Sequence, residues 1–181
     1  MNLPNKLTLL RVILIPFFVF FYLGGDILPF DGAYVAAIIF IIASLTDLFD
    51  GKIARKHNLV TNFGKFMDPL ADKLLVVSAL VCFVELKRMA SWIVLIIIAR
   101  EFIISGFRLV AAEGGKVIAA SYWGKIKTAV TMVTIIFMIP EFSGTAVFVV
   151  EQILIYASLI LTVVSLVDYM AKNKGVLGGK M

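Results

Sequence analysis

Long, unbroken apolar runs constrain the fold of this chain more than any other feature. Hydrophobic residues make up 61% of the 181 residues, which is more apolar surface than a soluble core of this size can bury. Each run is long enough to cross roughly 30 Å of hydrocarbon as a helix. The runs are also too long and continuous for the strands of a membrane barrel, so helices are the only plausible spanning form.

The sequence therefore predicts an all-α integral membrane protein with one domain over residues 1–181. We expect a six-transmembrane-helix bundle with a short N-terminal juxtamembrane segment. The predicted spans are residues 7–23, 34–56, 66–86, 91–112, 121–140 and 145–170.

Lysine and arginine residues are distributed unequally between the two sides of these spans. Of the 17 basic residues, only Lys87 and Arg88 fall in a connection on the side opposite the N-terminus. The positive-inside rule then makes the N-terminal side cytoplasmic, with both termini and the connection between the second and third spans on that side of the cell membrane. The net charge of +5 mainly reflects this topology. Because no basic stripe alternates with aromatic residues, we expect no nucleic-acid partner.

Four aspartates interrupt the apolar pattern at the end of the second span and the start of the third: Asp47, Asp50, Asp68 and Asp72. One aspartate at the centre of a membrane helix costs roughly 2.5 to 3.5 kcal/mol on insertion scales, so four together need a compensating partner. A divalent cation suits converging carboxylates, because it prefers oxygen ligands and keeps positions for water or substrate phosphates.

The spacing of these aspartates supports a shared site. At 100° per residue, Asp47, Asp50 and Gly51 fall within about a third of the circumference of one helix, and Gly64, Asp68 and Asp72 within about 80° on the next. The small glycine residues on the same faces admit a ligand or a neighbouring backbone. The alternative is a set of buried ion pairs between the aspartates and Lys52, Lys65 and Lys73.

The complete pattern resembles a known family. Asp-x2-Asp-Gly-x2-Ala-Arg-x8-Gly-x3-Asp-x3-Asp, which begins at Asp47, is similar to the signature of the CDP-alcohol phosphatidyltransferases at every fixed position. Residues 2–11, 99–102 and 124–128 further resemble the bacterial phosphatidylglycerophosphate synthase branch of that family. The resemblance implies an enzyme that moves a phosphatidyl group from CDP-diacylglycerol to the hydroxyl of a small alcohol and releases CMP. It also implies a homodimer in the lipid bilayer.

The family resemblance assigns roles to particular residues. It makes Asp47, Asp50, Asp68 and Asp72 ligands of two Mg²⁺ ions, with Mn²⁺ as a possible substitute, and makes Asp72 the general base as well. It also assigns the head group of CDP-diacylglycerol to Asn5, Thr8, Gly51, Arg55 and Thr61. An alternative role as helix caps or interfacial anchors is open to the polar residues near the start of the first span, which are Asn5, Thr8 and Arg11.

A second basic cluster lies within the fourth span and at the start of the fifth: Arg100, Arg108, Lys125 and Lys127. Isolated charges are costly in hydrocarbon, so an anion is expected to meet them. These residues therefore predict a pocket for the phosphate of a phosphorylated acceptor such as glycerol 3-phosphate. In the alternative arrangement, Glu101 and Glu113 neutralise the arginines while the lysines reach to the interface.

Two questions of function stay open in the sequence. The aspartate motif does not distinguish glycerol 3-phosphate from phosphatidylglycerol, inositol phosphate or serine as the acceptor, and only the flanking segments favour glycerol 3-phosphate. A different class of protein, an ion or proton transporter, also places aspartates in membrane helices. The clustering of the aspartates beside one cytoplasmic connection argues against a transport pathway.

Overall fold

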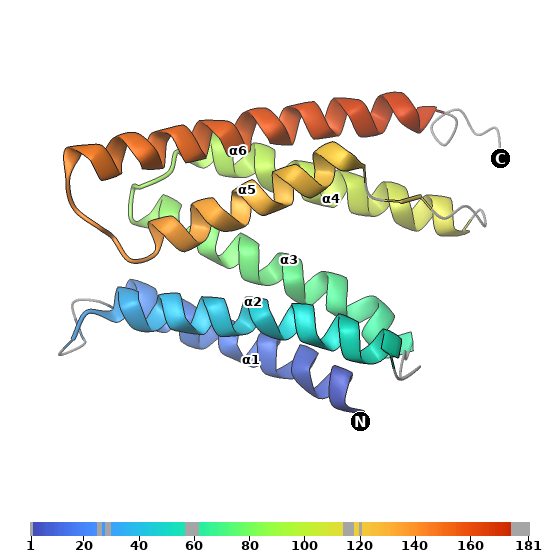
Figure 1. Ribbon diagram of the computed structural model, residues 1–181, viewed down its shortest axis with the longest axis horizontal. Coiled ribbons are helices and arrows are strands. Elements are labelled where there is room, and N and C mark those ends of the chain that lie inside the picture. The colour runs from blue at the N-terminus through green and yellow to red at the C-terminus, as the bar shows by residue number, and fades with distance from the viewer. Residues whose placement is uncertain are drawn as a thin grey trace. The chain divides into compact units, whose positions relative to one another are not determined.

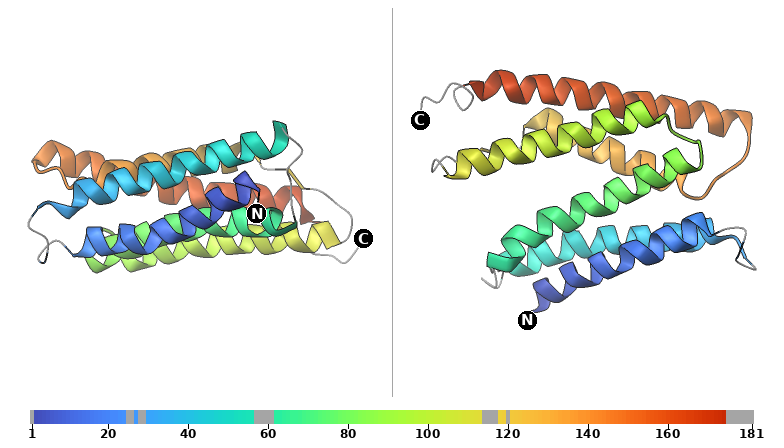
Figure 2. Two further views of the ribbon diagram at one scale, coloured as in Figure 1. Left: turned by 90° about the horizontal axis from the view of Figure 1, so that it is seen from below. Right: turned by 180° about the vertical axis from the view of Figure 1, so that it is seen from behind.

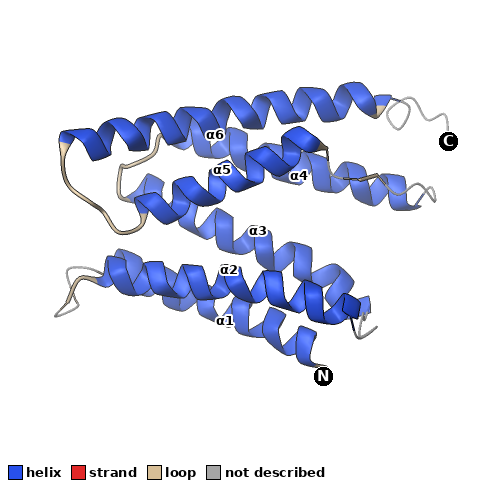
Figure 3. Ribbon diagram, in the orientation of Figure 1, coloured by secondary structure: helices blue, strands red, loops and turns tan. Residues whose placement is uncertain are grey.

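The computed structural model describes residues 2–24, 27, 30–56, 62–113, 118–119 and 121–174. Within those residues the chain forms six α-helices and no strands (Figures 1 and 3). The helices are α1 (Leu3–Leu23), α2 (Gly32–Lys56), α3 (Asn62–Glu85), α4 (Ser91–Glu113), α5 (Tyr122–Met138) and α6 (Thr145–Lys172).

The predicted spans correspond one to one with these helices, so the all-α prediction is confirmed. The largest differences are at the starts of α1 and α3, which begin at Leu3 and Asn62 rather than at residues 7 and 66. The Asn2 side chain caps the helix by accepting a hydrogen bond from the Asn5 amide at 3.3 Å, and Pro4 occupies the first turn, where its missing N–H has no cost. The residues expected to form a short segment before the first helix are therefore its first turns.

The chain divides into two compact units, of which the first contains residues 1–88 and 135–142. Its antiparallel helices α1 and α2 lie side by side, and α3 contacts both of them (Figures 1 and 2). Phe18, Phe40 and Phe83 are fully buried in this unit, and the Phe18 ring lies 5.7 Å from the Phe40 ring. Aromatic packing of this kind stabilises the three helices as one body.

The first unit is also joined at the end of α3 by Arg88. Its guanidinium donates hydrogen bonds to the Tyr22 hydroxyl at 3.0 Å and to the Met138 carbonyl, and it forms an ion pair with Glu141 at 3.3 Å. These contacts attach the segment that follows α5 to α1 and α3.

The second unit contains residues 89–134 and 143–181. In it α4 packs against α6, and the Phe107 ring meets the Tyr169 ring edge to face with 6.3 Å between centroids. The hydroxyls of Thr134 and Ser158 form a hydrogen bond of 2.9 Å that joins α5 to α6.

The surface of α6 is inverted relative to a helix of a soluble protein. Thr162 and Ser165 on one face are fully buried, whereas Ile153 and Ile160 are 62% and 61% exposed. Small polar residues between helices and large apolar residues on the outside are typical of membrane helices, because lipid gives no reason to bury isoleucine. Within the described part of the chain, α6 and residues 5–23 of α1 are long and apolar enough to cross a membrane.

Candidate active site

The first pair of predicted metal ligands lies in the last turns of α2. Asp47 and Asp50 are one turn apart in this helix, and Gly51 and Arg55 follow in the same helix. The regular geometry of α2 places residues 47, 50 and 51 on one face, as the spacing predicted. The positions of these four side chains, and all of Thr61, lie outside the described residues.

The second pair lies on α3, where Asp68 and Asp72 are separated by one turn and are both half-buried. Helix α3 continues through Pro69, and Gly64 one turn before Asp68 is buried. Carboxylate oxygens one turn apart on a single helix face suit a hard divalent cation such as Mg²⁺. The donor type and spacing on α3 therefore fit the ion that the family resemblance implies. Among the residues that the structure describes, no three His, Cys, Asp or Glu side chains lie together in a group that could hold a metal ion.

Helix α1 contacts both aspartate-bearing helices through one face. The fully buried Thr8 hydroxyl donates a hydrogen bond to the Asp68 carboxylate on α3. Three residues later, the fully buried Arg11 donates from Nε to the Ala43 carbonyl on α2 at 3.2 Å, one turn before Asp47. The family resemblance predicts that Asn5 and Thr8 bind the head group of CDP-diacylglycerol. Asn5 is buried and Thr8 is placed beside a predicted metal ligand.

For Arg11, as for Asn5 and Thr8, the sequence leaves open a substrate role or a role as an interfacial anchor. An arginine inside an otherwise apolar helical run is costly unless it is paired, and that cost was the available signal. The sequence alone could not identify its partner, because a backbone carbonyl 32 residues away carries no residue-specific pattern.

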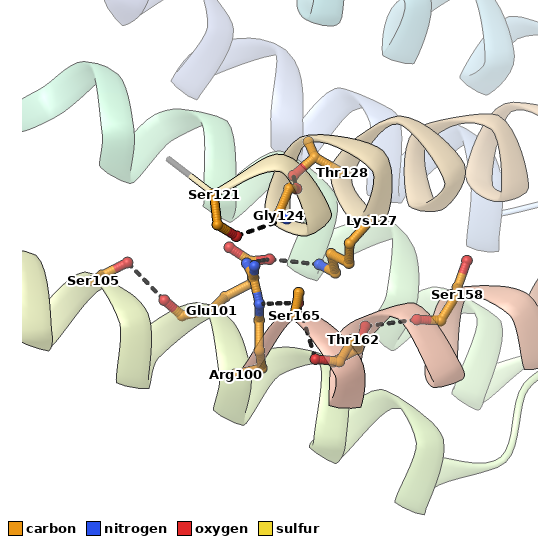
Figure 4. Close-up of polar contacts among 10 residues, drawn as sticks. All are labelled: Arg100, Glu101, Ser105, Ser121, Gly124, Lys127, Thr128, Ser158, Thr162 and Ser165. Carbon is orange, nitrogen blue, oxygen red and sulfur yellow. Dashed lines mark hydrogen bonds and ion pairs between the residues drawn. The ribbon is translucent and has the colours of Figure 1, made fainter. Parts of the chain in front are cut away.

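Two members of the second basic cluster, Arg100 and Lys127, meet at Glu101 in α4 (Figure 4). Its Oε1 atom accepts hydrogen bonds from Arg100 Nη1 at 3.0 Å and from Lys127 Nζ at 2.5 Å. The Arg100 Nε atom donates to the Ser165 hydroxyl on α6 at 3.0 Å. Two predicted phosphate-binding cations are thus brought together by one carboxylate. Glu101 thus pairs with Arg100, as the alternative arrangement expects, whereas Lys127 is 2% exposed rather than extended to the interface.

The other two predicted cations are arranged differently. Arg108 is exposed, and its guanidinium lies over the Tyr169 ring at 5.9 Å from the centroid. Lys125 is exposed near the start of α5. The structure therefore brings Arg100 and Lys127 together at Glu101 and places Arg108 over the Tyr169 ring.

The start of α5 contributes to the same cluster. The Ser121 hydroxyl caps the helix by accepting a hydrogen bond from the Gly124 amide at 3.1 Å. A Cβ atom at position 124 would lie 3.2 Å from Arg100 Nη2 and 3.3 Å from Ser121 Oγ. Glycine at this position therefore lets the arginine approach the first turn of α5 closely.

Comparison with known proteins agrees with the motif. Residues 1–164 match the family described as CDP-alcohol phosphatidyltransferase. The chain is 44% identical to the CDP-diacylglycerol--glycerol-3-phosphate 3-phosphatidyltransferase of Bacillus subtilis strain 168, with 95% of each protein aligned. It is 43% identical to the protein of the same name from Haemophilus influenzae, over 96% of this chain and 94% of the relative.

The corresponding protein of Escherichia coli K12 is 45% identical, over 84% of this chain and 88% of the relative. The family match covers α1 to α5 and most of α6, and it includes all four aspartates and the cluster around Glu101. On these grounds the chain belongs to the CDP-alcohol phosphatidyltransferase family.

Proposed function

We propose that this enzyme transfers the phosphatidyl group of CDP-diacylglycerol to sn-glycerol 3-phosphate, which gives phosphatidylglycerol phosphate and CMP. The observation that carries the proposal is the 43–45% identity to relatives named for this reaction, over most of each chain. The complete aspartate motif on α2 and α3 supports it. The single family match over residues 1–164 supports one catalytic domain over residues 1–181.

The four aspartates would hold two Mg²⁺ ions, or Mn²⁺ in their place, and Asp72 would also accept the proton of the acceptor hydroxyl. Bound cations supply charge neutralisation at the pyrophosphate. The chain itself must hold four carboxylates in register on two helices. Thr8 contributes to this by donating its hydroxyl hydrogen bond to Asp68, which fixes the direction of one carboxylate oxygen.

The CDP-diacylglycerol head group is assigned to Asn5, Thr8, Gly51, Arg55 and Thr61. Glycine at position 51 permits close approach of the nucleotide to α2. Arginine at position 55 offers a planar fork suited to phosphate oxygens, and the amide and hydroxyl groups offer neutral hydrogen bonds. This assignment rests on the family resemblance and on the chemistry of each side chain.

The acceptor phosphate is assigned to the basic cluster of Arg100, Arg108, Lys125 and Lys127. Arg100 and Lys127 are the strongest members, because both are buried and their cationic groups meet at one point. Buried cations bind a phosphate more strongly than exposed ones, since water screens them less. The capped N-terminus of α5 adds a favourable dipole for an anion at the same place.

Arg100→Gln is expected to raise the KM for glycerol 3-phosphate by roughly tenfold to a hundredfold and to leave the KM for CDP-diacylglycerol nearly unchanged. The reason is that one lost charge-assisted hydrogen bond is worth about 1.5 to 3 kcal/mol. Arg100→Lys should also be impaired, because it cannot reproduce the planar fork. Both KM values are to be measured on folded, detergent-purified protein. Equal KM values for wild type and variant would place the acceptor phosphate elsewhere.

We infer that all six helices span the cytoplasmic membrane, with both termini and the aspartate helices' shared connection on the cytoplasmic side. The exposed apolar faces support insertion into lipid. The distribution of the basic residues supports the orientation. A cysteine-directed probe at position 56 is then expected to react only from the cytoplasm, and one at position 27 only from outside. The reverse labelling pattern would invert the topology.

A homodimer follows from the family resemblance and is tested by the mass of the detergent-solubilised protein.

The acceptor is tested by assaying purified protein with CDP-diacylglycerol and glycerol 3-phosphate, phosphatidylglycerol, inositol phosphate or serine. We expect release of CMP with glycerol 3-phosphate and a lipid product that contains a second phosphate. Preference for another acceptor would keep the family chemistry and change the substrate. Absence of CMP release with every acceptor would favour the transporter alternative.

A further inference from the structure

Glu101 is the carboxylate that two buried cations, Arg100 and Lys127, contact together. Its single Oε1 atom accepts from both Arg100 Nη1 and Lys127 Nζ. The side chains of Arg100 and Lys127 are 7% and 2% exposed, whereas that of Glu101 is 20% exposed. Two buried cations therefore share one carboxylate, and this carboxylate is the most solvent-accessible of the three groups.

The charges in this trio do not balance. Arg100 and Lys127 contribute two positive charges and Glu101 contributes one negative charge, in a setting where charges are expensive. A phosphate that enters the cluster has to compete with the Glu101 carboxylate for the same two donors. The free energy of phosphate binding is then the difference between the interaction of the two cations with phosphate and their interaction with Glu101.

We propose that Glu101 is a built-in counter-anion that weakens the binding of the acceptor phosphate, so that the phosphate-bearing product can leave. This inference rests on the proposed acceptor-phosphate site. The reaction keeps the acceptor's phosphate on its product, and a strong phosphate site would therefore retain the product as firmly as the substrate. By offering Arg100 and Lys127 another partner, Glu101 lowers the cost of releasing the product.

Contacts other than the one with Glu101 hold the Arg100 side chain in place. The Nε atom of Arg100 is fixed by the Ser165 hydroxyl, which in turn donates to the Thr162 carbonyl at 3.0 Å. Its Nη2 atom lies against the first turn of α5, where Gly124 leaves room for it. Figure 4 shows Ser165 and Glu101 contacting different parts of the arginine. Loss of the Glu101 charge should therefore leave the guanidinium in position.

The two roles for Glu101 predict opposite changes in affinity. If Glu101 competes with phosphate, Glu101→Gln keeps an oxygen acceptor of the same shape and removes the competing charge, so phosphate binds more tightly. If Glu101 only orients the two cations, the same variant binds phosphate more weakly. A shorter carboxylate in Glu101→Asp contacts the cations less well, so competition predicts an intermediate gain in affinity and orientation predicts a loss.

The test is calorimetric titration of inorganic phosphate and of glycerol 3-phosphate into detergent-purified wild type, Glu101→Gln, Glu101→Asp, Arg100→Gln and Glu141→Gln. The last variant is a matched control, because it removes a carboxylate from another arginine, Arg88, in the first unit. We expect Glu101→Gln to lower the Kd for phosphate by roughly threefold to tenfold. Glu101→Asp should lower it less, and Glu141→Gln should leave it unchanged.

Inhibition by the lipid product gives a second readout. In Glu101→Gln, added phosphatidylglycerol phosphate should inhibit more strongly and the KM for glycerol 3-phosphate should fall, whereas kcat should fall or stay constant. A Kd for phosphate that is unchanged or higher in both Glu101 variants, with Arg100→Gln weakened, would overturn the counter-anion role and keep the phosphate site. An unchanged Kd in Arg100→Gln would instead remove the site itself, and with it the role of Glu101.

Discussion

Asp72→Asn is expected to reduce turnover by about 10² to 10⁴-fold, the usual contribution of a positioned general base. The amide has nearly the same shape as the carboxylate, so the packing of α3 is preserved. It cannot accept the proton of the acceptor hydroxyl, and it is a poorer ligand for a divalent cation. Turnover is measured as CMP release, and binding of CDP-diacylglycerol is measured separately on the same preparation.

Asp168→Asn is the matched control for that experiment. Asp168 lies on α6 and pairs with Lys172 at 2.6 Å, four residues away on the same helix. A pair of this kind contributes about 0.3 to 0.5 kcal/mol, so this variant should retain wild-type turnover. Wild-type turnover in Asp72→Asn as well would exclude the carboxylate from proton transfer, whereas equal losses in both variants would indicate a general sensitivity to removal of charge.

Removal of divalent cations by a chelator is expected to abolish CMP release. A Lewis-acid cation contributes several kcal/mol of charge stabilisation, which corresponds to roughly three orders of magnitude or more in rate. Addition of Mg²⁺ or Mn²⁺ in excess over the chelator should restore the rate. Full activity in the chelated enzyme would exclude a role for an exchangeable cation at the aspartates.

Calcium distinguishes a structural effect of the cation from a catalytic one. Its bonds to oxygen are about 2.4 Å long, against about 2.1 Å for Mg²⁺, and its coordination is looser. We therefore expect Ca²⁺ to protect the protein against thermal unfolding but to restore little activity. Recovery of the full rate with Ca²⁺ would contradict a site that depends on the close geometry of Mg²⁺.

The helices could be predicted from the sequence because long apolar runs leave the backbone few alternatives to a helix. The apolar runs predicted the six helices that the described residues form, and the spacing of Asp68 and Asp72 predicted their positions on one helix. The start of α1 was misplaced because Asn5 and Lys6 are polar and were not counted as part of an apolar run. The cap formed by Asn2 and the proline at position 4 could have corrected this.

The side-chain partners could not be predicted in the same way. Thr8 and Asp68 are 60 positions apart in the sequence, and Arg100 and Ser165 are 65 apart. Such contacts depend on how helices pack and rotate, which local periodicity does not determine. Glu101 illustrates the limit: the sequence identified it as a candidate neutraliser of the arginines, but not as the shared acceptor for Arg100 and Lys127.

The hydroxyl groups on the buried face of α6 have a consequence for how the protein is made. The Thr162 hydroxyl donates to the Ser158 carbonyl at 2.7 Å, and the Ser165 hydroxyl donates to the Thr162 carbonyl, so both are satisfied within their own helix. In the proposed membrane topology, α6 can therefore partition into lipid alone, without unpaired donors at Thr162 or Ser165. Only the later assembly of helices would add the contacts with Thr134 and Arg100. Insertion and assembly of α6 can thus be separate stages of biogenesis.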